Sequence, residues 1–442
     1  MKAVWNNIIH VVVRCTVIFF AFCGIPSYAE AALTDTLETE ASRPTGSRLT
    51  FLYDPGLTMR SGAEDIITLH YGITRTEENL VGTHWFGEEN FVGKVGGILG
   101  RFTKYALLDV PVDYFSVVLA HEYLGHGARY RELGIENIHY GFDAPPPYGK
   151  GGGEATSSLN GNVVSYHEQI GMWLGGLEVQ PLINQRLALR WMATRTMHYR
   201  DAMLYFWSWQ IGFNYIQGTT GSLTTGKSDN DPQAYIRLLN RDNGYFDPAS
   251  PLFSIKDLKS RVQLDLANPF VFFSLYASLK TYLWDGNSTF DFPTLQLGQI
   301  DYLPLLRAGL TPFGLEYHIE NYLRYGDVLS LVDLRLGDGT FHNSWGGVGL
   351  TLQNVYAKNR FSTDVELNIW TQPELRFGGV PGSAAGGGTG GALSLRGYYD
   401  VSSGELPLCG VVELGFKSVG FLEGYAFDAS PIFRIGAAIQ AR

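Results

Sequence analysis

Two histidines and a glutamate near the middle of the chain have the side chains that a metal-dependent hydrolase uses. His121 and Glu122 are adjacent, and His126 follows after three intervening residues. Neutral imidazole binds zinc readily, and zinc lowers the pKa of a bound water to about 7. A carboxylate beside that water can take its proton and pass it to a leaving amine. The stretch therefore predicts amide hydrolysis, with His121 and His126 as metal ligands and Glu122 as the general base.

This stretch resembles the H-E-x-x-H motif of the zincin metallopeptidases, with one additional residue between Glu122 and His126. In a regular α-helix, side chains five residues apart lie roughly 140° apart around the axis, so the two rings would face different sides. A single π-type turn would bring them back together, and Gly125 is the point where the helix is weakest. The alternative is a buried or interfacial helix whose histidines are hydrogen-bonded and inert.

The resemblance also implies a third ligand, because in the gluzincin branch of the zincins a glutamate on a second helix completes the site. Glu178 is the first candidate, in a helix predicted over residues 163–193. Gly171 and Gly175 on the same face would let this helix approach another one closely. His167 shares that face and is an alternative ligand or an outer partner of one.

Glu154 is the other alternative ligand, in a Pro- and Gly-rich stretch with no helical pattern. The glycines at 151–153 could also form a flap that pairs with an extended substrate. A peptidase needs a group that stabilises the oxyanion, and His167, Arg129 and Tyr166 are unranked candidates.

The first 29 residues read as a secretory signal peptide. Lys2 and Arg14 provide a sparse basic region, an apolar core spans 15–25, and small residues follow it. We therefore expect export to the periplasm or outer membrane of a Gram-negative bacterium. After cleavage the formal charge would be about −12, which argues against a nucleic-acid partner. Cys409 would be the one remaining cysteine, so no internal disulfide is expected.

The periodicity of apolar residues predicts an α+β fold with three segments after the signal peptide. Residues 30–89 are mixed, with short strands expected over 48–53 and 65–72. Residues 90–284 have helical spacing and form the predicted helical metallopeptidase domain. Residues 285–442 have a period of two and form an antiparallel sheet, or a partial or complete β-barrel.

Alternation is clear in the last third of the chain, where Val365, Leu367 and Ile369 alternate with Asp364, Glu366 and Asn368. This pattern predicts antiparallel strands with one face in water. The richness in glycine and aromatic residues, together with strands of about 8 to 11 residues, resembles outer-membrane β-barrels. That resemblance implies membrane association through the β-region.

Two functions of different classes follow from these observations. The first is a zinc-dependent peptidase of the cell envelope that acts on a peptide or protein substrate. The second is a non-enzymatic outer-membrane protein with a helical domain, serving transport, assembly or envelope structure.

Overall fold

The computed structural model describes residues 48–81, 90–158, 164–220, 230–343, 345–378, 388–402 and 408–440, all within a compact unit that begins at Thr45. The predicted signal peptide lies outside the described residues. The predicted α+β class is confirmed, because helices dominate the chain up to residue 284 and a large antiparallel sheet follows.

The helical part contains α-helices, tighter or wider helical turns, and two short strand pairs. The α-helices are α2 (Met59–Val81), α3 (Phe91–Lys104), α4 (Val110–Leu119), α5 (Gly127–Glu132), α6 (Tyr166–Thr194), α7 (Tyr199–Gly218), α8 (Asp231–Asp242), α9 (Ile255–Arg261) and α10 (Pro269–Leu275). The π-type turns are η3 (Tyr105–Asp109), η4 (Ala120–His126) and η6 (Tyr276–Trp284), and η5 (Val262–Ala267) is a 3-10 helix. The strand pairs are β2 (Ile138–Phe142) with β3 (Gly153–Ser157) and β4 (Thr196–His198) with β5 (Thr289–Asp291).

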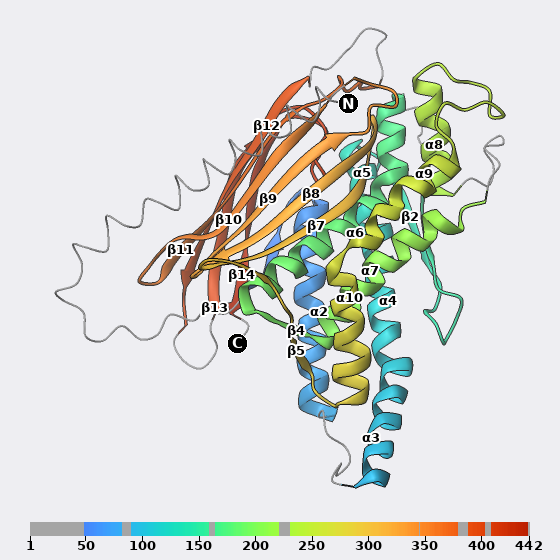
Figure 1. The fold of residues 1–442 in the computed structure, drawn as a ribbon. Helices are drawn as coiled ribbons and strands as arrows, with labels where there is room; N and C mark the ends of the chain where they lie inside the picture. The colour runs from blue at the N-terminus through green and yellow to red at the C-terminus, as the bar shows by residue number, and fades with distance from the viewer. Residues whose placement is uncertain are drawn as a thin grey trace. The chain divides into compact units, whose positions relative to one another are not determined.

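The large sheet has ten antiparallel strands in the order β1-β14-β13-β12-β11-β10-β9-β8-β7-β6. Their bounds are β1 (Arg48–Tyr53), β6 (Leu295–Leu297), β7 (Ile300–Thr311), β8 (Gly314–Tyr325), β9 (Val328–Gly337), β10 (Gly346–Lys358), β11 (Phe361–Thr371), β12 (Thr389–Asp400), β13 (Leu408–Lys417) and β14 (Ser430–Gln440). The helices pack against one face of this sheet, with α6 against β7, β8 and β9 and α2 beside β1 (Figure 1).

The first and last described strands pair with each other, because β1 lies beside β14 with Leu49 opposite Ile439. The strand predicted over 48–53 is thus confirmed. The strand predicted over 65–72 is wrong, because these residues lie inside α2. Ile66, Ile67 and His70 are buried there on one helical face. A β-branched run favoured the strand, but packing of that face decided for the helix.

The two faces of these strands differ in character, as the alternation predicted. On β11, Glu366 and Asn368 face the helices and are buried, whereas Leu367 and Ile369 are 37% and 56% exposed. Alternation showed that the two faces differ, but it did not show which one the helical part would cover. The helices cover the polar face.

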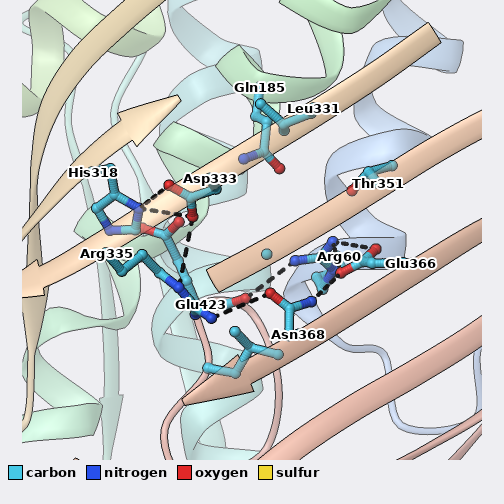
Figure 2. A pocket seen from close by; sticks show the side chains of 12 residues that line it. Arg60, Gln185, His318, Leu331, Asp333, Arg335, Thr351, Glu366, Asn368 and Glu423 are labelled. Atoms are coloured by element: carbon cyan, nitrogen blue, oxygen red, sulfur yellow. Dashed lines mark hydrogen bonds and ion pairs between the residues drawn. The ribbon is translucent and has the colours of Figure 1, made fainter. Parts of the chain in front are cut away.

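Charges on the covered face are paired across the sheet and with the helices. Arg60 of α2 binds the Glu366 carboxylate at 2.6 Å, and Figure 2 shows this pair facing Asn368. Arg396 of β12 bridges Glu64 of α2 and Glu413 of β13, at 2.7 and 2.8 Å. Buried charges are tolerated when they are paired in this way, whereas removal of one partner would leave a costly unpaired charge.

Side chains from the helical part also bind the backbone of β1, at one end of the strand order, and of β7, next to the other end. On β1, the backbone N–H of Leu52 donates to Asp65 at 2.7 Å, and Thr68 donates to the carbonyl of Thr50 at 2.8 Å. On β7, the N–H of Ala308 donates to Asp265 at 2.7 Å. These contacts satisfy backbone groups that a neighbouring strand would otherwise bind.

Asp265 should make the stability of the fold depend on pH. Burial, partly opposed by the hydrogen bond from Ala308, raises the pKa of Asp265 from 3.8 to about 7. The folded chain therefore holds this proton more tightly than the unfolded chain, so the stabilisation is complete below about pH 4 and is lost as pH rises to about 7. Asp265→Asn keeps an acceptor for Ala308 and does not titrate.

Between pH 4 and pH 7, we expect the free energy of unfolding of the Asp265→Asn chain to rise relative to that of the natural chain, by an amount on the order of a few kcal/mol. Above pH 7 the difference should stay constant. Urea unfolding of both chains at four pH values measures this difference. A difference that stays constant from pH 4 to pH 7 would contradict the assignment.

Candidate metal centre

The motif stretch folds as the π-type turn η4, which spans Ala120–His126 and lies between α4 and α5. The predicted π-type turn is therefore confirmed. It brings the two rings to one side, where the Nε2 atoms of His121 and His126 lie 3.3 Å apart. Both side chains are at least 90% buried.

The wide turn fits because η4 crosses α6 where both backbones lack side chains. A Cβ atom on Gly125 would lie 2.6 Å from the carbonyl oxygen of Gly175 and from the Cα of Gly176. A Cβ on Gly176 would lie 2.3 Å from Nε2 of His121. The close approach predicted from Gly175 is thus present, and Gly176 leaves room for the His121 ring.

Asp231, at the start of α8, brings a carboxylate to the two histidines. Its Oδ2 lies 3.1 Å from Nε2 of His121 and 3.2 Å from Nε2 of His126. The three atoms form a nearly equilateral triangle. In a tetrahedral site with ligands about 2.0–2.1 Å from the metal, neighbouring ligand atoms lie about 3.3 Å apart. The spacing therefore matches three corners of a tetrahedral metal site.

The other ring nitrogens have partners outside the triangle. Nδ1 of His126 lies 2.6 Å from the carbonyl oxygen of Met172, which must accept its proton. Nδ1 of His121 lies 3.4 Å from the side-chain amide of Gln180. A proton on Nδ1 of His126 leaves its Nε2 free to bind a cation, which is the usual arrangement at histidine ligands.

Charge within the group is unevenly distributed when no cation is present. Burial alone would lower the pKa of His126, but Asp231 and Glu122 raise it to about 9. Burial would raise the pKa of Asp231, but His126 and His121 hold it well below its usual range. The metal-free centre therefore holds a proton that a divalent cation would displace on binding.

Glu122 has the surroundings of a general base. Burial raises the pKa of its carboxyl, partly opposed by the two histidines, and only 5% of the residue is exposed. Its Oε2 atom has no hydrogen-bond partner among the described residues. A buried carboxylate oxygen without a partner is costly, and a metal-bound water would supply one. The donor set and this free oxygen therefore both fit a catalytic metal ion.

Glu178, the first candidate for the third ligand, lies elsewhere. Both of its oxygens bind the guanidinium of Arg129, at 2.5 and 2.7 Å, and it accepts a further hydrogen bond from the N–H of Gly424. Asp231 takes the position that was predicted for Glu178. Arg129, a candidate for the oxyanion stabiliser, is occupied by the same ion pair and by Glu132.

The remaining predicted residues also lie outside the triangle. Nε2 of His167 lies 3.0 Å from Asp242, and its Nδ1 accepts a hydrogen bond from the N–H of Arg376. Tyr166 is 37% exposed. Glu154 is exposed on β3, opposite Gly141. Glu154 does contribute to the field that raises the pKa of Glu122.

Sequence reasoning missed Asp231 and two tyrosines. The hydroxyl of Tyr215 accepts a hydrogen bond from the N–H of Asp231 at 3.3 Å, and its ring lies 6.0 Å from that of His121. Burial, Asp231 and Glu122 raise the pKa of Tyr130 to about 12. Asn230, Pro232 and Gln233 form a capping-box pattern that would have revealed α8, although not that it carries a ligand.

A second group of potential ligands, His318, Glu320 and Asp333, lies on the covered face of the sheet. Here a guanidinium occupies the place of a cation, because Arg307 donates to Glu320 at 2.7 Å and lies 3.1 Å from Nδ1 of His318. Figure 2 shows His318 and Asp333 directed toward each other in this charged layer. Its charges are already balanced, so we do not assign a metal to it.

Comparison with known protein families gives no match, and no curated protein or solved structure matches the chain.

Loss of Asp231 should abolish metal binding. Asp231→Ala removes one corner of the triangle, so we expect zinc affinity to fall by more than the roughly 10–100-fold that follows loss of an outer partner. Glu178→Gln is the matched control. It should leave zinc affinity unchanged and destabilise the fold by about 3 kcal/mol, because Arg129 stays buried without its full partner. Competition with a chromophoric chelator measures the affinity, and the opposite ranking of the two variants would restore Glu178 as the ligand.

The close crossing of η4 and α6 at Gly125 should also be sensitive to substitution. A methyl group at Gly125 has no space between the two backbones, so we expect Gly125→Ala to destabilise the fold by about 1–3 kcal/mol and to weaken zinc binding. Gly72 is exposed within α2 with nothing near its Cβ position, so Gly72→Ala should instead stabilise by about 0.5–1 kcal/mol. Denaturant unfolding distinguishes these outcomes, and a neutral Gly125→Ala chain would contradict the crossing.

Proposed function

We propose that the chain is a zinc-dependent peptidase of the bacterial cell envelope. The observation that carries this proposal is the triangle of His121, His126 and Asp231, together with Glu122, whose carboxyl interacts electrostatically with all three and whose Oε2 has no hydrogen-bond partner among the described residues. A site with three protein ligands keeps its fourth position open, which is the pattern of catalytic rather than structural zinc. Export to the envelope rests on the predicted signal peptide.

Zinc, when bound, supplies a water whose pKa is about 7. Glu122 is the general base in this proposal. Its raised pKa brings it closer to neutrality, where a carboxyl group can both accept a proton from the water and donate it to the leaving amine. Two histidines and a carboxylate suit zinc, since imidazole nitrogen and carboxylate oxygen are both common zinc ligands.

An extended peptide has a place to bind beside Glu122. The backbone of Gly153 in β3 lies so close that a Cβ there would be 2.7 Å from Cγ of Glu122. Among the described strands, β3 pairs with β2 alone; on its other edge the carbonyl of Ala155 accepts a hydrogen bond from Tyr130, and the backbone of Gly153 has no neighbouring strand. Strand addition at that edge would carry a peptide bond past Glu122. This keeps the predicted flap role for 151–153, now as part of a hairpin.

The oxyanion of a hydrolysed amide needs a hydrogen-bond donor. We assign this role to Tyr215, because the hydroxyl of Tyr130 already donates to the carbonyl of Ala155 at 3.3 Å. The hydroxyl of Tyr215 stays protonated at neutral pH, because burial and the charges of Asp231 and Glu122 raise its pKa. A protonated phenol is a donor, which a tyrosinate is not.

Glu122→Gln tests the proposal directly. Glutamine keeps the shape of the side chain but does not accept a proton, so we expect hydrolysis to fall by about 10²–10⁴-fold while zinc stays bound. The zinc-loaded chain and its variant are each incubated with a peptide library from a digested proteome, and products are identified by mass spectrometry. A zinc-loaded natural chain that yields no more products than Glu122→Gln would favour the non-enzymatic envelope protein.

A further inference from the structure

The face of the large sheet that points away from the helices is apolar. Eleven large side chains on five adjacent strands are each 37–64% exposed there: Phe51, Tyr53, Leu367, Ile369, Leu393, Leu395, Val412, Leu414, Phe416, Phe433 and Ile435. They belong to β1, β14, β13, β12 and β11, which are consecutive in the sheet. The outward positions of these strands that the structure describes carry no charged side chain.

The covered face of the same strands has the opposite character. Glu366, Arg396, Glu413 and Arg434 point inward and are each less than 10% exposed. A sheet in water normally buries its apolar face and exposes its polar one. This arrangement is therefore inverted, and the apolar face is much larger than the isolated exposed hydrophobic residues of ordinary surfaces.

The dimensions of the apolar face match a lipid layer. From Phe361 to Ile369, β11 extends over nine residues, or about 30 Å at about 3.3 Å per residue. A strand tilted by about 45° would cover about 20 Å of thickness, close to the apolar band of about 25 Å on membrane-inserted strands. Tyr356, Phe361 and Tyr399 gather at one end, where Phe361 lies opposite Tyr399. Aromatic residues favour the interface between lipid and water.

We propose that the outward face of β1 and β11–β14 contacts the hydrocarbon of a lipid bilayer. The lack of charge on this face favours hydrocarbon as the occupant, because hydrocarbon is itself uncharged. A protein partner would normally meet a rim of polar groups. Two helix side chains at the β1 end of this surface support the proposal, because Asp65 and Thr68 bind backbone groups of β1 that hydrocarbon could not satisfy.

This inference is independent of the metal centre. In it, strands rather than helices contact the membrane. Among the described helices, none is both long and apolar enough to cross a bilayer. The sheet therefore gives the expected membrane association a defined surface, on the face opposite the helical part that holds the metal site.

Vesicle flotation of the full chain tests the proposal. The chain is refolded from urea with vesicles of phosphatidylcholine, whose headgroups carry no net charge, and is centrifuged through a density gradient. Leu414 is 55% exposed, so Leu414→Arg should not disturb the fold in detergent. In the bilayer it places a charge in hydrocarbon, and we expect partitioning to fall by ~30-fold or more.

Phe246→Arg is the matched control, because Phe246 is 66% exposed in the loop between α8 and α9 and should leave flotation unchanged. Zinc content and circular dichroism of each variant in detergent report whether it is folded. The proposal is overturned if the natural chain does not float, or if it floats as well with Leu414→Arg as without it. A lipid-free dimer that Leu414→Arg dissociates would instead assign the face to a second copy of the chain.

Discussion

The structure of the centre depends on three polar atoms held within 3.3 Å of one another in a buried place. Two imidazole nitrogens and a carboxylate oxygen do not gather in this way without a positive charge between them, because each presents a lone pair to the others. In the metal-free chain the charge is a proton on His126. A divalent cation would satisfy all three atoms at once. The nearly equal sides of the triangle suit such a cation better than they suit a single hydrogen bond between two of the atoms.

The surrounding fold is arranged so that this convergence can occur. The additional residue between Glu122 and His126 requires the wide turn of η4, and that turn requires space beside it. The space exists because α6 presents Gly175 and Gly176 where η4 crosses it. Helix α6 in turn packs against α8, which carries Asp231, and against the sheet. The same helix thus connects the ligands to the layer of paired charges on the covered face.

The sequence predicted those features that a local pattern records. The histidine spacing predicted the π-type turn that brings His121 and His126 together, and alternating residues in 348–353 and 364–369 predicted strands that are present in β10 and β11. It did not predict Asp231, because the packing of α6 brings α8 to the motif. No regular spacing between Asp231 and the histidines in the sequence records that contact. Glu178 was chosen by resemblance, but it forms a close ion pair with Arg129, one turn beyond the motif. This ion pair leaves the carboxylate of Glu178 unavailable to a metal ion.

The alternating pattern distinguished the two sheet faces but did not show which one the helices would cover, for a related reason. Period-two alternation separates Leu367 from Glu366 but does not say which side other elements will cover. The helices supply Arg60 and Arg186, which pair with Glu366 of the sheet, so the polar face is the covered one. The polar face of an amphipathic sheet can be covered by helices that carry charge, and its apolar face by an apolar medium.

Zinc K-edge X-ray absorption of the purified, zinc-loaded chain tests whether His121, His126 and Asp231 bind a metal ion. We expect one zinc per chain with four nitrogen or oxygen ligands at about 2.0–2.1 Å and the outer-shell scattering of two imidazole rings. We also expect one imidazole to be lost from the spectrum in His126→Ala. A chain that retains no zinc, or a spectrum without imidazole scattering, would contradict metal binding by these residues.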